Sequence, residues 1–136
     1  MSEGIDNQYD FFKKVNLDAD GNLGVSIEGV SDPRTVSTVS TATLIIDSSI
    51  TDQSIITAQA EGLTIGVPTG TPVEGRKLII RIKDNGTNRA LTWNAIFEVI
   101  GVTLPTTTTA NKTIYVGLIY NGTSTKWDVI AVKEQA

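Results

Sequence analysis

Residues 77–83, Lys77-Leu78-Ile79-Ile80-Arg81-Ile82-Lys83, carry the clearest β-strand pattern in the chain. In an extended segment successive side chains point to opposite faces, so Leu78, Ile80 and Ile82 share one apolar face. The opposite face is charged, and Ile79 is its apolar exception. The pattern predicts a strand with one face in a core and one face in water.

A turn signal follows this strand directly. In Asp84-Asn85-Gly86-Thr87 the Asn-Gly pair readily adopts the positive φ that tight hairpins need. We therefore expect a hairpin that returns along residues 89–93, and a second one at Asn121-Gly122. Other runs rich in β-branched and aromatic residues lie at 35–46, 54–60, 62–67, 96–100, 113–120 and 126–132.

This spacing indicates the fold class. About eight short strands recur every 8–12 residues or so, and no segment has a strong helical period. The sequence predicts an all-β protein, a small antiparallel β-sandwich that is jelly-roll-like, over residues 34–136.

Residues 1–33 differ in character and are expected to form an extended N-terminal arm. They carry seven acids against two lysines, a net −5, whereas residues 34–136 carry nine bases against eight acids, a net +1. Several glycines and Pro33 interrupt every candidate element. A disordered tail and a docking arm are both consistent with this composition. The concentration of aromatic residues favours the docking arm, and the residues expected to anchor it to a partner are Tyr9, Phe11, Phe12 and Val15.

Composition argues against catalysis. The chain has no histidine and no cysteine, so the commonest general base and the soft nucleophile are absent. The net charge of −4 without a basic cluster argues against a nucleic-acid partner. No apolar run approaches the roughly 20 residues that span a bilayer, and the N-terminus lacks a secretory signal pattern. We expect no enzyme, no cofactor and no membrane partner.

One segment partly matches a metal-binding loop. Asn16, Asp18 and Asp20 occupy the first, third and fifth positions of a calcium loop, and Gly21 occupies the sixth. The twelfth position is Ile27, where a bidentate glutamate is needed. An acidic turn explains the segment better, and no metal site is expected.

Two further groups of side chains are candidate sites. An aromatic platform for a carbohydrate could comprise Trp93, Trp127, Tyr115 and Tyr120, with Trp93 and Trp127 as the possible glycan contacts. Aromatic residues on strands more often pack in a core. The carboxylates Asp84, Glu98 and Asp128 look isolated in the sequence, so a glycosidase pair is not expected.

The threonine run 106–109 is poorly suited to a helix and has no apolar side. It is expected to form an exposed loop or to lie at a seam between subunits.

Several segments resemble a known family. The block 72–87, together with Ala90-Leu91-Thr92-Trp93, Leu104-Pro105-Thr106-Thr107-Thr108 and Trp127-Asp128-Val129, resembles a β-domain of tailed-bacteriophage virion proteins. Residues 11–25 are similar to N-terminal segments of phage structural proteins. The resemblance implies a non-enzymatic virion component, synthesised in the bacterial host cytoplasm and exposed on the virion surface.

The leading hypothesis is a capsid decoration or head-fibre subunit, anchored by residues 1–33 and projecting its β-domain. Such proteins are often homotrimers, and the expected partners are other capsid or tail proteins. Two alternatives stay open: a tail fibre or baseplate adaptor, and a module that binds host glycans.

Overall fold

The computed structural model describes residues 16–17, 21, 23–24 and 32–136, and the chain divides into two units, Met1–Asp32 and Pro33–Ala136. In the first unit, β1 (Asn16–Leu17) pairs antiparallel with β2 (Leu23–Gly24). Every regular element of the described residues is a strand, and none of these residues forms a helix that would cross a membrane.

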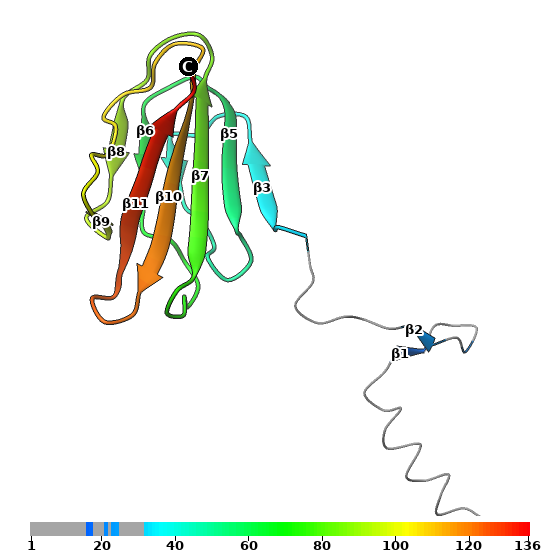
Figure 1. The fold of residues 1–136 in the computed structure, drawn as a ribbon. Coiled ribbons are helices and arrows are strands. Elements are labelled where there is room, and N and C mark those ends of the chain that lie inside the picture. Colours follow the sequence, from blue (N-terminus) through cyan, green and yellow to red (C-terminus); the bar gives the residue numbers. More distant parts are fainter. Residues whose placement is uncertain (1–15, 18–20, 22, 25–31) are drawn as a thin grey trace, which may run out of the picture. The chain divides into compact units, whose positions relative to one another are not determined.

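The second unit contains two sheets (Figure 1). The larger has the order β3-β5-β7-β10-β11-β9, and the smaller has the order β4-β6-β8. Their strands are β3 (Thr35–Thr38), β4 (Thr43–Leu44), β5 (Gln53–Gln59), β6 (Leu63–Ile65), β7 (Lys77–Asp84), β8 (Leu91–Trp93), β9 (Phe97–Val99), β10 (Thr113–Asn121) and β11 (Lys126–Glu134).

From β3 to β8 the chain winds as a coil. Successive strands alternate between the two sheets, and the strands of each sheet pair in parallel: β3 with β5 and β7, and β4 with β6 and β8. Parallel neighbours need a crossover between them. Here β4 lies within the crossover that joins β3 to β5, and β6 lies within the crossover that joins β5 to β7.

The core lies between the sheets. A single cluster of buried apolar residues includes Leu44, Leu63 and Ile65 from the smaller sheet and members of β5, β7, β10 and β11 from the larger one. In β7, Leu78, Ile80 and Ile82 are each 0% exposed, as the sequence pattern predicts, while Ile79 faces the opposite side. Burial of such side chains contributes about 1.5–3 kcal/mol each.

The expected strand 35–46 is divided by a corner. Residues 35–38 join the larger sheet as β3, and residues 43–44 join the smaller sheet as β4. Buried Gln59 holds the corner: its Oε1 accepts from the backbone N of Thr41 at 3.1 Å, and its Nε2 donates to the carbonyl of Thr41 at 2.6 Å. These bonds satisfy backbone groups that leave the ladder.

Only one of the two expected hairpins forms. At Asn121-Gly122 the chain reverses from β10 into β11, which pair antiparallel. At Asn85-Gly86 it turns with Gly86 at φ 97°, but β8 then pairs with β6 in the other sheet. The expected hairpin between residues 77–83 and 89–93 is therefore wrong, because the second strand buries Leu91 in the smaller sheet.

The all-β class is confirmed, and the antiparallel, jelly-roll-like arrangement is not. Among residues 33–136, antiparallel pairing is found for β7 with β10 and for β10 with β11, whereas the other strand pairs are parallel. The larger sheet is mixed and the smaller one is parallel.

Candidate functional site

The residues expected to anchor the chain, Tyr9, Phe11, Phe12 and Val15, lie outside the described residues. Of the three candidate metal ligands, Asn16 belongs to β1, and Asp18 and Asp20 also lie outside the described part. Within that part, no group of three or more acidic side chains is placed to bind a metal ion.

The two tryptophans belong to the packed interior. Trp127 is 2% exposed, and its ring meets Tyr120 edge-on with 5.3 Å between ring centroids. Trp93 packs edge-on against Phe97 at 5.6 Å, and its Nε1 donates to the carbonyl of Pro105 at 2.8 Å. The burial of Trp127 leaves no ring face for a sugar. Trp93 is only partly buried, so its role as a glycan contact stays a prediction.

The three carboxylates separate into one buried group and one surface pair. Glu98 and Asp128 are register partners of the parallel strands β9 and β11. The fold thus brings together two side chains that look isolated in the sequence. Asp128 accepts from Asn121 Nδ2 at 3.1 Å, and Lys126 Nζ lies 3.9 Å from Glu98. Both carboxylates are therefore engaged with neighbours on a solvated edge.

Asp84 is the buried group, and it supports the fold. Burial alone would raise the pKa of Asp84, but hydrogen bonds from Thr108, Asn111 and Gly86, together with the charge of Arg89, hold it below its usual value. Thr108 is 1% exposed, so one member of the threonine run is buried. The other three residues of the run are exposed, as expected for a loop.

One end of the coil is open, and we call it the open end. Among residues 33–136, β3 and β4 are edge strands, each paired on one side only. Between them lies a hollow of about 210 Å³, lined by Val36, Thr38, Leu44, Ile45, Ile46, Asp47, Ile50, Thr51 and Ser54. Nearby Val39 is 67% exposed and Ile50 is 59% exposed. Apolar side chains beside free edges are typical of a surface that pairs with another chain.

An ionic network holds β3 where the second unit begins. Asp52 Oδ2 accepts from the backbone N of Arg34 at 2.8 Å and from its Nε at 3.1 Å. Arg34 Nη2 bonds Asp52 Oδ1 at 2.8 Å, and Arg76 approaches the same oxygen at 3.2 Å. The pKa of Asp52 is lowered, chiefly by the hydrogen bond from the backbone N of Arg34 and next by the hydrogen bond from its guanidinium. The network ties the start of β3 to the loop before β5.

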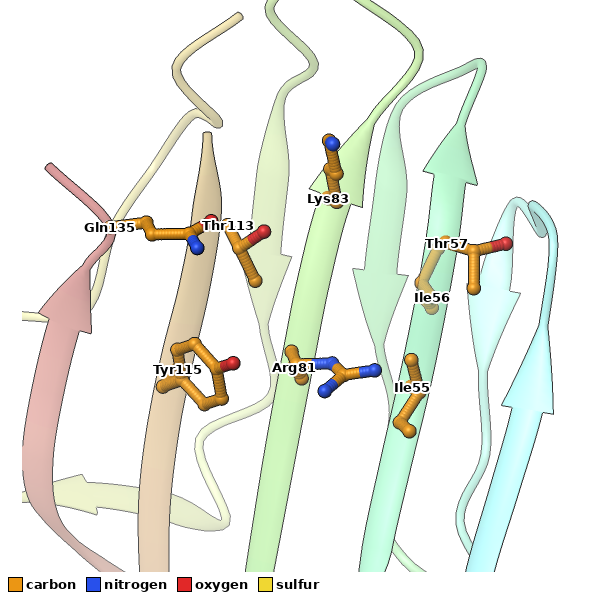
Figure 2. A pocket seen from close by; sticks show the side chains of 8 residues that line it. All are labelled: Ile55, Ile56, Thr57, Arg81, Lys83, Thr113, Tyr115 and Gln135. Atoms are coloured by element: carbon orange, nitrogen blue, oxygen red, sulfur yellow. The ribbon is translucent and has the colours of Figure 1, made fainter. Parts of the chain in front are cut away.

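The outer face of the larger sheet forms a second surface. One row of register partners crosses it: Ile55 on β5, Arg81 on β7, Tyr115 on β10 and Lys133 on β11. The guanidinium of Arg81 lies 6.0 Å from the centre of the Tyr115 ring. Figure 2 shows Ile55, Arg81 and Tyr115 of this row beside Lys83, Thr113 and Gln135. They line a hollow of about 350 Å³.

The sequence indicates exposed edges at residues 35–46, but it does not indicate a site on the outer face of the larger sheet. The alternation of residues 77–83 placed Arg81 and Lys83 on a solvated face, but nothing local indicated Tyr115 as their neighbour. The strand pattern of residues 35–46 does not predict the corner that exposes Val39.

Comparison with known proteins does not assign a family. No family model and no curated protein matches the chain. A solved structure described as "Structure of a chaperone-substrate complex" aligns with 85% of this chain at 14% identity and a TM-score of 0.45. The match covers 18% of that chain, and at this level it carries no argument about function.

Proposed function

We propose that this chain is a non-enzymatic structural protein of a tailed-bacteriophage virion. In this proposal residues 1–33 anchor it to the particle as a capsid decoration or head-fibre subunit, and the β unit is exposed on the virion surface. The support from sequence is the resemblance of residues 72–87 and 104–108 to phage virion β-domains.

The structural observation that carries the proposal is the open end. A coil of parallel strands leaves an unpaired edge at each end unless something covers it. At one end the larger sheet continues into β10, β11 and β9, while β3 and β4 are free edges within residues 33–136. Free edges beside exposed apolar residues suit a subunit that is completed by assembly, and a homotrimer is the proposed state.

Particle binding tests the anchoring. The full chain is expected to sediment with phage particles that lack it, and Phe11→Ser/Phe12→Ser is expected to stay in the supernatant because each buried aromatic contributes about 1.5–3 kcal/mol. The matched control, Lys13→Gln/Lys14→Gln, keeps the aromatics and should still sediment. Equal sedimentation of the chain with the aromatic substitutions would contradict the anchoring role.

The alternative location is the tail, where the same module would act as a fibre or baseplate adaptor. Immunogold labelling of intact particles distinguishes the two sites directly. Label confined to the tail would replace the head assignment while keeping the structural role.

A further inference from the structure

The hollow on the outer face of the larger sheet has the chemistry of a ligand site. Its cations are Arg81 and Lys83, both on β7 and two residues apart. Side chains two residues apart on a strand point to the same face, so both cations border the same space. Among the described residues, neither takes part in an ion pair.

The neighbouring side chains add hydroxyl, amide and apolar surface. Thr113 is the register partner of Lys83, and the backbone N of Gln135 bonds the carbonyl of Thr113 at 2.8 Å, which brings Gln135 to the rim. Thr57 lies on the other side, on β5. Figure 2 shows the Arg81 guanidinium extending from β7 toward Ile55, with Tyr115 on its other side.

The geometry points to an anionic saccharide as the ligand, with a carboxylate-bearing sugar as the unit recognised. The carboxylate would pair with Arg81 and Lys83, since charge-assisted hydrogen bonds are the strong ones. The sugar hydroxyls would meet Thr57, Thr113 and Gln135, and the C–H face of the ring would lie against Tyr115 or Ile55. A hollow of about 350 Å³ lies within the range of small-ligand sites and suits one or two sugar rings.

This site uses neither tryptophan, and of the aromatic residues that could form a carbohydrate platform it contains Tyr115 alone. It is also independent of how residues 1–33 attach the chain to a particle. A negative result here would leave the anchoring proposal unchanged, and a failure of anchoring would leave this site unchanged.

The test is an NMR titration of the full-length, ¹⁵N-labelled chain with methyl β-D-glucuronide, and with methyl β-D-glucoside as the neutral match. We expect amide shifts confined to Gln135 and to the residues of β5, β7 and β10 around the hollow, with a Kd on the order of 1 mM for the glucuronide. The glucoside should bind at least about fivefold more weakly, because it lacks the charge-assisted bonds.

Substitutions locate the site. Arg81→Gln and the more exposed Lys83→Gln should each weaken glucuronide binding by about fivefold or more. Lys77→Gln removes the same charge from the same face of β7 outside the hollow, and it should change binding by less than about twofold. The spectra themselves show that each variant is folded.

Three outcomes would overturn the proposal. Equal amide shifts with the glucoside would show that the carboxylate is not recognised. Equal loss of glucuronide affinity in Lys77→Gln and Arg81→Gln would show that the overall positive charge of the face binds the ligand, without a defined site. Equally strong binding of sodium acetate or of a polyglutamate peptide would show that the face accepts anions without recognising a sugar.

Discussion

Thr108 donates a hydrogen bond from Oγ1 to Oδ2 of Asp84 at 2.7 Å, across 24 positions of the chain. The other oxygen of Asp84 accepts from the backbone N of Gly86 and of Asn111, each at 2.9 Å. Thr108 Oγ1 also accepts from the backbone N of Arg89 at 2.8 Å. One buried carboxylate therefore joins the end of β7 to the loop before β10.

Replacing Thr108 tests this junction. Thr108→Val keeps the branched shape but removes the donor, so the free energy of unfolding should fall by about 1–3 kcal/mol as Asp84 loses a buried partner. Urea denaturation measures the change. Thr109→Val, at an exposed position of the same run, should change the free energy of unfolding by less than about 0.5 kcal/mol. Equal losses at the two positions would contradict the role of Thr108.

The same carboxylate predicts a dependence of stability on pH. Because the pKa of Asp84 is lower in the folded than in the unfolded chain, its contribution is present above the unfolded Asp value of roughly 4 and is lost as pH falls through the folded value. Denaturation midpoints between pH 6 and pH 2 should therefore decline. Asp84→Asn should be less stable near neutral pH and should show a shallower decline; an unchanged slope would exclude Asp84 as a source.

Arg34 and Asp52 should show measurable coupling. A double-mutant cycle with Arg34→Gln and Asp52→Asn is expected to give a coupling free energy of about 1 kcal/mol in unfolding. This is the upper range for partly exposed pairs, because the contact has several hydrogen bonds. Asp52→Asn should lower the free energy of unfolding more than Arg34→Gln does, because Arg76 also loses its ion-pair partner. The comparison cycle combines Lys126→Gln with Glu98→Gln, whose Nζ and Oε2 atoms lie 3.9 Å apart. Its coupling free energy should be close to zero.

The tryptophans should behave as core residues. Trp127→Ala is expected to cost about 3–5 kcal/mol in unfolding free energy because it leaves a cavity, whereas Trp93→Phe keeps most of its packing and should cost less than half as much. In Trp93→Phe the remaining Trp127 should be shielded from acrylamide quenching. Strong quenching of that fluorescence would contradict its burial.

The open end should govern self-association. Val39→Glu/Ile50→Glu places charges on a proposed interface, so light scattering should show a smaller mass while the unfolding midpoint changes little. Val73→Glu is a matched control, because Val73 is 68% exposed and Val39 is 67% exposed. A wild-type chain that is monomeric at all concentrations would rule out the proposed oligomer.

The approximate positions of most strands, and the inward face of β7, follow from the sequence alone. The alternation of apolar residues in 77–83 predicts which side chains are buried, and it does so without reference to the neighbouring strands. The same holds for Ile114, Val116 and Leu118, which the structure buries, and for the outward charges of β7.

The tertiary structure decided which sheet each strand joins. Two Asn-Gly turns with the same local chemistry have different outcomes, because β8 buries Leu91 beside β6 while β11 buries Trp127 beside β10. Likewise the corner after β3 depends on Gln59, and the burial of Thr108 depends on Asp84. Partners this distant are selected by the summed burial and pairing of all the strands, which no local pattern encodes.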